Sequence, residues 1–232
     1  KKMGLAYDDI RLNEFALWGM LDETVLALED LRVGPSYSNY ALYNLTSTKA
    51  KVCLQGTGGD ELFAGYTWRY EAMRYIDVLN RTKGNWLSFD FNPDDYFAIP
   101  RTVEERMVFD CNHFLEGVLS VGDKLSMAWG VEDRVPFLDN ELVDFITTVP
   151  TQYRYGKKLL RDALEGIVPA EIIARKKVGF TSPEAEWFYL PQAKERIIET
   201  MRTSPARAYV CMKGAERWIE ERNTPALWCF LA

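Results

Sequence analysis

Histidine is nearly absent from this sequence, since the 232 residues contain only His113. Ser-His-Asp triads and histidine-based metal sites both need histidine, so a single one argues strongly against either. The four cysteines lie far apart and form no CxxC pair. This spacing argues against a zinc site and is typical of reduced core residues in a cytosolic protein. They are Cys53, Cys111, Cys211 and Cys229.

A basic excess and a long apolar run are also missing. The net charge is −6 and basic residues form only short clusters, so we expect no nucleic-acid partner. No apolar run approaches about 18 residues, and the first residues lack the apolar region of a signal peptide. We therefore expect no membrane span and a cytoplasmic location. Apolar residues make up 47% of the sequence, enough to bury a substantial core.

Hydrophobic periodicity predicts a mainly helical chain. The expected helices cover residues 13–31, 37–47, 60–75, 103–119, 140–149, 159–167, 183–201 and 205–221. Asp139 is the expected cap of the helix at 140–149. Residues 51–55 are predicted to form a buried strand, and residues 81–100 a surface loop. A strand, a glycine turn and a helix in succession normally belong to a parallel sheet. We therefore expect the α/β class, mostly α-helical with few parallel strands, and further strands outside this sequence.

The stretch VCLQGTGGDELFAGY, residues 52–66, places three glycines and two acids at one turn. Glycines there let a ligand approach the backbone, and the following helix N-terminus favours an anion such as phosphate. Asp60 and Glu61 either cap the helix or bind Mg²⁺ that bridges to phosphate. The spacing is neither a Walker A nor a GxGxxG motif, so a purely structural glycine turn with acidic caps is the alternative.

Two further segments carry candidate chemistry. In DKLSMAWGVEDRVPFLD, residues 123–139, Glu132 is expected to be partly buried with Arg134 as its partner. It is either a base or half of an ordinary ion pair. In ARKKVGF, residues 174–180, a basic triplet runs into Gly179. Its lysines either reach a phosphate or belong to a solvated loop.

Together and in this order, the three segments resemble the synthetase domain of the asparagine synthetase family. The first resembles the family segment LSGEGGDELFGGY, and the second resembles DKxSMAxGxExRVPFLD. Residues 156–187 resemble GKxxLRxA…LPxxIxxRxKxGFxxPxxxW. The resemblance covers residues 5–190. It implies a Rossmann-like ATP-pyrophosphatase domain, of which residues 1–232 would be the C-terminal portion.

The resemblance implies ATP-dependent amide formation. A carboxylate substrate, aspartate or a similar acid, would attack the α-phosphate of ATP to give an acyl-adenylate and pyrophosphate. Ammonia from glutamine, produced by a glutaminase domain, would then displace AMP. A homodimer is compatible with this family.

The resemblance also implies roles for single residues. Asp60 would bind Mg²⁺, and Lys177 would stabilise phosphate charge in the transition state. Glu132 matches a glutamate that, in lactam-forming relatives, helps a tyrosine to activate the amine. The nucleotide would lie along Gln55, Gly56, Thr57, Gly58 and Gly59.

The sequence departs from the family pattern in three ways. It contains neither the SGGxDS loop nor the glutaminase domain with its leading cysteine, and we expect both to lie upstream. The chain alone is therefore expected to be inactive and to bind ATP weakly. Thr57 stands where asparagine synthetases have Glu and lactam synthetases have Tyr. A ring-forming relative that makes β-lactams or macrolactams, and a non-catalytic scaffold of the same fold, are the alternatives.

Overall fold

The fold is described from a computed structural model, which describes residues 3–29, 36–71, 100–177, 179, 183–205, 217–222 and 227. The first part contains α1 (Glu14–Leu28), α2 (Ser36–Ser47), β1 (Val52–Leu54), α3 (Gly59–Leu62) and α4 (Thr67–Glu71). The middle part contains α6 (Val103–Phe109), the π-helical turn η2 (Asp110–Phe114), α7 (Leu115–Met127), β2 (Glu132–Arg134) and the 3₁₀ turn η3 (Pro136–Leu138). The last part contains α8 (Asn140–Thr148), α9 (Thr151–Arg154), the 3₁₀ turn η4 (Tyr155–Lys157), α10 (Lys158–Ala163), α11 (Ala170–Ile173), α12 (Glu184–Trp187) and α13 (Pro191–Thr203).

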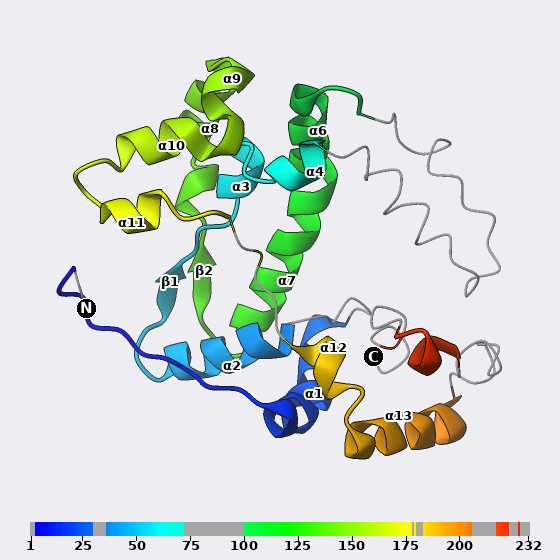
Figure 1. The fold of residues 1–232 in the computed structure, drawn as a ribbon. Coiled ribbons are helices and arrows are strands. Elements are labelled where there is room, and N and C mark those ends of the chain that lie inside the picture. Colours follow the sequence, from blue (N-terminus) through cyan, green and yellow to red (C-terminus); the bar gives the residue numbers. More distant parts are fainter. Residues whose placement is uncertain are drawn as a thin grey trace.

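The two strands form a small parallel sheet within a mostly helical structure, as the expected fold class requires. β1 pairs with β2 in the register Val52 to Glu132 and Leu54 to Arg134. Figure 1 shows α7 on one side of the strands and α10 and α11 on the other. Among the described helices, none combines the length and the apolarity needed to cross a bilayer.

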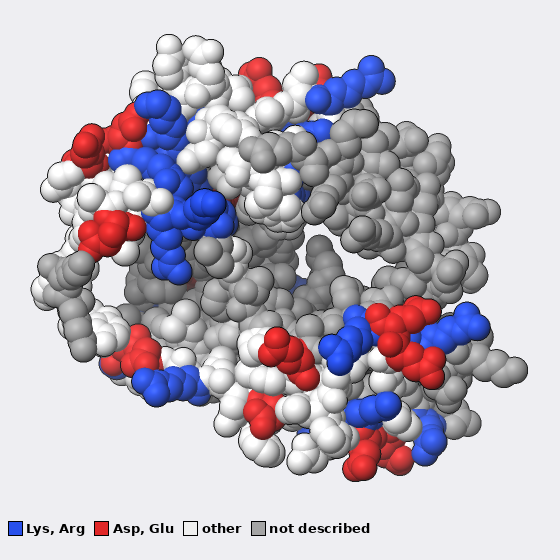
Figure 2. Space-filling view, viewed as in Figure 1, with Lys and Arg blue, Asp and Glu red and all other residues white. Residues whose placement is uncertain are grey.

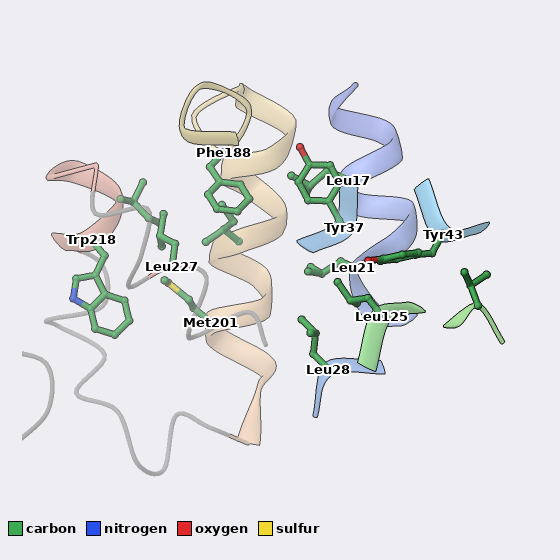
Figure 3. Close-up of a cluster of buried hydrophobic side chains, with 13 residues drawn as sticks. Leu17, Leu21, Leu28, Tyr37, Tyr43, Leu125, Phe188, Met201, Trp218 and Leu227 are labelled. Carbon is green, nitrogen blue, oxygen red and sulfur yellow. The ribbon is translucent and has the colours of Figure 1, made fainter. Parts of the chain in front are cut away.

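The main hydrophobic core joins the start of the chain to its last described helices. Leu17, Leu21 and Leu28 of α1 lie on one buried stripe because they recur at helical spacing. Figure 3 shows this stripe facing Leu125 of α7 and the aromatic ring of Phe188. The core therefore holds α1, α7 and the α12–α13 region together.

A second cluster lies directly behind the glycine turn. Leu62 and Phe63 pack with Ile146 of α8, and Phe137 and Leu138 of η3 pack against them. The first two sequence segments, about 80 residues apart, are thus joined by apolar contact. This contact fixes where the turn sits on the end of β1.

Several predicted elements are confirmed. The expected helices at 13–31, 37–47 and 140–149 correspond to α1, α2 and α8. Asp139 caps α8, since its Oδ1 accepts from the backbone N–H of Glu141 at 3.1 Å and of Leu142 at 3.3 Å. The helix expected at 103–119 is longer than predicted, because α6, η2 and α7 follow one another without a break.

The single helix predicted at 60–75 is wrong within the described residues, which end at 71. α3 ends at Leu62, and α4 begins only at Thr67. The reason is a tertiary one: Phe63 and Ala64 turn their carbonyl groups toward η4, where they accept from the N–H groups of Lys157 at 2.9 Å and Gly156 at 3.0 Å. Ala64 adopts a left-handed φ of 47° to do so.

The strand prediction was correct in place but wrong in burial. Val52 and Leu54 are exposed, and only Cys53 turns inward. The second strand was missed because Glu132-Asp133-Arg134 has no apolar residue. It is a strand because its backbone pairs with β1, which its side chains do not reveal.

The helices predicted after residue 158 were too long. α10 ends at Ala163, and the helix predicted at 183–201 is divided into α12 and α13, with Pro191 starting the second. Most of the helix predicted at 205–221 lies outside the described residues. The loop predicted at 81–100 also lies outside them, apart from Pro100.

Candidate functional site

The glycine turn, residues 55–59, follows β1 and leads into α3. Gln55 extends the parallel ladder by donating its N–H to the carbonyl of Arg134 at 2.8 Å. Gly58 then takes a left-handed φ of 90°, which glycine adopts without strain. A β-carbon at Gly58 would overlap the side chain of Leu138, and one at Gly59 would lie 3.2 Å from the ring of Phe137. Packing on η3 thus requires glycine at position 58 and leaves little space at position 59, whereas a β-carbon at Gly56 would meet open space.

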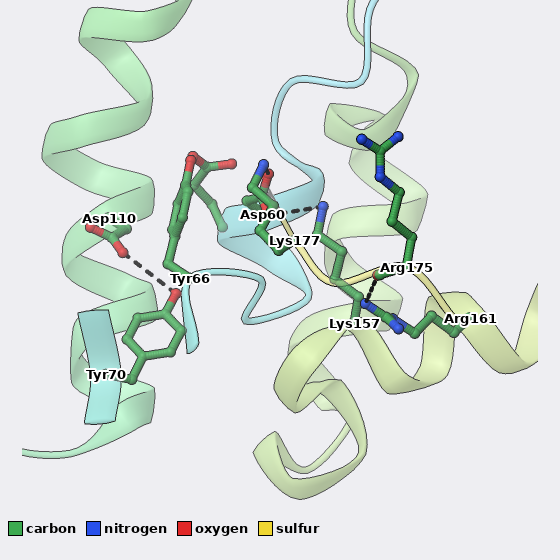
Figure 4. Close-up of polar contacts among 9 residues, drawn as sticks. Asp60, Tyr66, Tyr70, Asp110, Lys157, Arg161, Arg175 and Lys177 are labelled. Carbon is green, nitrogen blue, oxygen red and sulfur yellow. Dashed lines mark hydrogen bonds and ion pairs between the residues drawn. The ribbon is translucent and has the colours of Figure 1, made fainter. Parts of the chain in front are cut away.

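Asp60 stands at the start of α3 and binds two lysines from distant segments. Its Oδ1 lies 2.9 Å from Nζ of Lys157, and its Oδ2 lies 2.8 Å from Nζ of Lys177 (Figure 4). One carboxylate is therefore shared by two ammonium groups, leaving a net charge of +1 at the end of the turn. The arrangement favours an incoming anion.

Gly65 makes room for this cluster. A β-carbon there would overlap the Asp60 carboxylate and crowd Cε of Lys157. The N–H of Gly65 also donates to the carbonyl of Asp60 at 2.7 Å, which closes the turn after α3. The glycine of the segment FAGY thus makes space for the Asp60–Lys157 pair.

A cationic pocket of about 500 Å³ opens beside Lys157 and Lys177. Five cations line it, and none of its described lining residues is acidic. They are Lys157, Arg161, Arg175, Lys176 and Lys177. Figure 2 shows blue side chains gathered on the part of the surface where Figure 1 places α10 and α11. The structure thus concentrates positive charge next to the turn.

Arg161 holds the basic segment against α10. Its guanidinium donates to the carbonyl of Ile173 at 2.7 Å. It also donates to the carbonyl of Arg175 at 3.1 Å (Figure 4). These bonds fix the backbone two residues before Lys177. Arg161 thereby helps to direct Lys177 toward Asp60.

Glu61, next to Asp60, points into the protein instead. It is buried and accepts a 2.6 Å hydrogen bond from the hydroxyl of Tyr66. Burial first, and the Glu61 carboxylate second, raise the pKa of Tyr66 far above its usual value. The Lys177 ammonium lies 5.9 Å from the centroid of the Tyr66 ring. Tyr66 thus connects the buried Glu61 to the lysine cluster.

A chain of hydrogen bonds joins the other side of the turn to β2. Thr57 donates to Oε1 of Gln55 at 2.8 Å, and Nε2 of Gln55 contacts the hydroxyl of Tyr43. Tyr43 donates to Oδ2 of Asp133 at 2.6 Å, and Cys53 donates to Oδ1 of Asp133 at 3.1 Å. The chain borders a neutral cleft of about 700 Å³ between α2, β1 and α7. None of its described lining residues is Asp, Glu, Lys or Arg.

The predicted site residues therefore fall into separate groups. Asp60 forms an ion pair with Lys177, and Gln55 is hydrogen-bonded to Thr57. Glu132 has no described bond to either pair. It is exposed and forms an ion pair with Nε of Arg134 at 2.8 Å. The Arg134 partnership was predicted correctly, but the expected burial of Glu132 was wrong. Since Glu132 pairs with Val52, the turn begins three residues, about 10 Å, further along the sheet.

Sequence reasoning gave no role to Lys157, Tyr43 or Asp133. Lys157 had a usable signal, because it is the lysine of the segment that resembles GKxxLRxA. Tyr43 and Asp133 had none, since their bond joins residues 90 positions apart. Only the pairing of the strands and the packing of α2 bring them together.

Comparison with known proteins agrees with the three-segment resemblance. The profile of the asparagine synthase family matches residues 1–226. The chain belongs to the asparagine synthase family. Its relatives include glutamine-hydrolysing asparagine synthetase 1 of Bacillus subtilis (strain 168), 33% identical over 140 residues, which cover 56% of this chain and 22% of the relative.

Two further relatives in the asparagine synthase family show how much of a complete protein this chain represents. A putative glutamine-hydrolysing asparagine synthetase of Mycobacterium tuberculosis (strain ATCC 25618 / H37Rv) is 34% identical over 171 residues, or 71% of this chain and 26% of the relative. The human glutamine-hydrolysing asparagine synthetase is 25% identical over 207 residues, or 82% of this chain and 32% of the relative. The chain thus spans between a fifth and a third of the length of these relatives.

Two departures from the family segment lie in the turn, at positions separated by one residue and joined by a hydrogen bond. Gln55 and Thr57 replace Ser and Glu of the segment LSGEGGDELFGGY, and their side chains are hydrogen-bonded to each other. The change from Glu to Thr therefore comes with a partner that holds the hydroxyl in place. The glycine turn of the asparagine synthase family is thus present, but its polar side chains at positions 55 and 57 differ from those of the family segment.

Proposed function

We propose that the complete gene product forms an amide bond at the expense of ATP, as an asparagine synthetase-like ligase. The observation that carries this proposal is the meeting of Asp60, Lys157 and Lys177 at the end of the glycine turn. These residues come from two family segments almost 100 positions apart. Family membership supports the reaction class, and the cationic pocket supports a phosphate-bearing substrate.

The two lysines are proposed to stabilise the pyrophosphate. When an oxygen of the substrate carboxylate attacks the α-phosphorus of ATP, the bond from that phosphorus to the β-phosphate oxygen breaks and an acyl-adenylate forms. Negative charge then grows on the leaving pyrophosphate. Ammonium groups already fixed beside that position lower the barrier, because they need no reorganisation during the reaction. Lys177 and Lys157 fit this role, since both are held by Asp60 and both line the cationic pocket.

The proposed place of Mg²⁺ is at Asp60. Among the described residues, no group of three or more His, Cys, Asp or Glu could hold a metal ion. Mg²⁺ bound with substrate phosphates usually needs only one or two carboxylates, so a lone Asp60 fits. Bound there, the ion would neutralise charge on the phosphate oxygens.

The nitrogen donor and the acceptor are also proposals. The acceptor is a carboxylic acid, aspartate or a similar compound, and the nitrogen is ammonia released from glutamine. The names of the relatives support both choices. The glycine turn is proposed to face the nucleotide at Gly56, where a β-carbon would have no atom of the described residues within 4 Å.

Pyrophosphate release by the complete gene product tests the proposal. The assay contains ATP, Mg²⁺, ammonium and one candidate carboxylic acid at a time, and release should depend on the acid. Lys177→Ala should lower the rate by about 10²-fold, since an electrostatic contact to the transition state is lost. Lys158→Ala is the matched control: Lys158 is exposed and forms an ion pair with Asp162, away from Asp60.

Two results would contradict the assignment. A Lys177→Ala rate within about threefold of the wild-type rate, below roughly 0.7 kcal/mol, would remove the catalytic role of Lys177. Micromolar ATP affinity of the 232-residue chain by itself would contradict the expectation that residues outside it complete the nucleotide site.

A further inference from the structure

The hydrogen-bond chain from Thr57 to Asp133 has a fixed direction. An ionised carboxylate only accepts hydrogen bonds, so the hydroxyl of Tyr43 must donate to Asp133. The oxygen of Tyr43 is then free only to accept, which requires Gln55 to present its NH₂ group to it. The carbonyl of Gln55 therefore faces Thr57, and Thr57 must donate its proton. One carboxylate thus sets the orientation of every member of the chain.

The direction of the hydrogen-bond chain determines whether Thr57 donates a hydrogen bond to a ligand or accepts one from it. A free threonine hydroxyl both donates and accepts, because it rotates about its C–O bond. Here its single proton is held by Gln55, so only the lone pairs of Oγ1 remain. Hydrogen bonds in series polarise one another, which makes this oxygen a better acceptor. The turn therefore presents an oriented acceptor to a ligand that carries an N–H or O–H group.

The surroundings of the chain are built to keep it in place. Gly122 of α7 faces it: a β-carbon there would lie 3.3 Å from Nε2 of Gln55 and 3.4 Å from Oδ2 of Asp133. The thiol of Cys53 donates to the second carboxylate oxygen of Asp133. Burial, together with this hydrogen bond, raises the pKa of Cys53 to about 12. Both oxygens of Asp133 are thus engaged. The members of the chain come from α2, β1, the glycine turn and β2, and α7 packs against them.

We propose that Asp133, Tyr43 and Gln55 are positioning residues that orient the Thr57 hydroxyl as an acceptor for the attacking nitrogen of the amide-forming step. The inference rests on the proposed function, in which the nitrogen nucleophile carries N–H bonds. The adenine and ribose of ATP also carry such donors, and the KM for ATP separates the two sources. Thr57 touches the nucleophile, and the other three act through Thr57. In that step the nitrogen lone pair forms the new C–N bond, AMP leaves with the electrons of the C–O bond, and the nitrogen loses one proton to solvent.

Steady-state kinetics of the complete gene product, with ammonium as the varied substrate, test the proposal. Thr57→Val keeps the shape and removes the oxygen, so the KM for ammonium should rise at least tenfold while the KM for ATP stays within threefold. Thr57→Ser should restore the KM for ammonium to within threefold of wild type. Tyr43→Phe should also raise the KM for ammonium, about fivefold, although Tyr43 does not touch the substrate. The double variant should be no worse than Thr57→Val alone, because both changes act on one oxygen.

The opposite results would overturn the proposal. An unchanged KM for ammonium in Thr57→Val removes the acceptor role. Effects of Thr57→Val and Tyr43→Phe that multiply show that Tyr43 does not act through Thr57. A general rise in the KM of every substrate shows a structural defect only.

A readout without turnover separates this inference from the proposed function. Alkylation of Cys53 at pH 8.5, followed by peptide mapping of the 232-residue chain, reports the thiolate fraction. Asp133→Asn removes the charge that helps to raise the pKa of Cys53, so alkylation should become about tenfold faster, whereas Asp144→Asn on the exposed face of α8 should leave it unchanged. An unchanged rate in Asp133→Asn overturns the chain itself. A wild-type protein that releases no pyrophosphate overturns the proposed function, and with it the role of Thr57.

Discussion

The two sides of the glycine turn use opposite means of recognition. On one side, the cationic pocket is lined by five positively charged side chains, and Asp60 shares its carboxylate between two of them. On the other side, the neutral cleft is lined by no Asp, Glu, Lys or Arg, and three of its polar lining residues, Tyr43, Cys53 and Gln55, belong to the hydrogen-bond chain. The cationic side is suited to attracting an anion over distance, whereas the neutral side is suited to selecting a ligand by the direction of its donors and acceptors.

This division suits a substrate with two unlike ends. In the proposed reaction, phosphate charge develops on the cationic side, and an uncharged nitrogen is held on the neutral side. Mixing the two would be costly, because an ammonium or guanidinium group on the neutral side would donate to the acceptor that the nitrogen needs. The turn keeps them apart, since it contributes Asp60 to one side and Gln55 and Thr57 to the other.

The largest expected effect is a loss of stability when a glycine of the turn that both sides share is replaced. Gly58→Ala forces a β-carbon into a left-handed backbone and against Leu138, so it should lower the free energy of unfolding by about 3 kcal/mol. Gly56→Ala is the matched control, because a β-carbon there meets open space, and it should cost less than 1 kcal/mol. Urea unfolding of the 232-residue chain measures both. Equal costs for the two variants would show that η3 does not constrain the turn.

The next effect is confined to the cationic side. Asp60→Asn removes the carboxylate that holds both lysines and would also bind Mg²⁺, so pyrophosphate release should fall by about 10²-fold, or about 2.7 kcal/mol. Asp162→Asn serves as the control, since Asp162 pairs only with the exposed Lys158 among the interactions described. The KM for ammonium should stay unchanged in Asp60→Asn. A rise in that KM would mean that the two sides are not independent.

A smaller effect is expected on the neutral side. Tyr43→Phe leaves the ring in the core but deprives Asp133 of a donor and Gln55 of an acceptor, so stability should fall by about 1.5 kcal/mol. Phe fills the same space, so the loss reports the hydrogen bonds and not a cavity. Urea unfolding gives the value, and a loss below about 0.5 kcal/mol would show that water replaces the chain without cost.

The smallest effect is the pH dependence of the neutral side. The folded Cys53 thiol keeps its proton up to a pKa of about 12, whereas the unfolded thiol loses it near pH 9. Between these values the folded state binds one proton more, so stability should fall as the pH rises. Cys53→Ser should make the curve flatter between pH 9 and pH 10. Parallel curves for wild type and Cys53→Ser would contradict the raised pKa.

The sequence predicted the helices better than the sheet. α1 and α8 follow from periodicity and a capping residue, both of which are local. β2 could not be found, since Glu132-Asp133-Arg134 lacks every side-chain signal of a strand and depends on its partner. The break after Leu62 was missed for the same reason: the bonds that end α3 come from Gly156 and Lys157. For the site, the order of the motifs indicated Asp60 and Lys177 as functional residues. The hydrogen bond between Tyr43 and Asp133 could be found only from the structure.

The space beside Gly65 couples the residues that can stand at positions 60, 65 and 157. Its missing side chain is the space in which the Asp60 carboxylate and the Lys157 stem lie, so a larger residue there cannot be accepted while both remain. In a family alignment, positions 60, 65 and 157 should therefore change in concert, with position 65 changing after one of the others has become smaller. A lineage that has lost the Asp60–Lys157 pair would be free to replace the glycine, and such a replacement would mark which members no longer use this cluster.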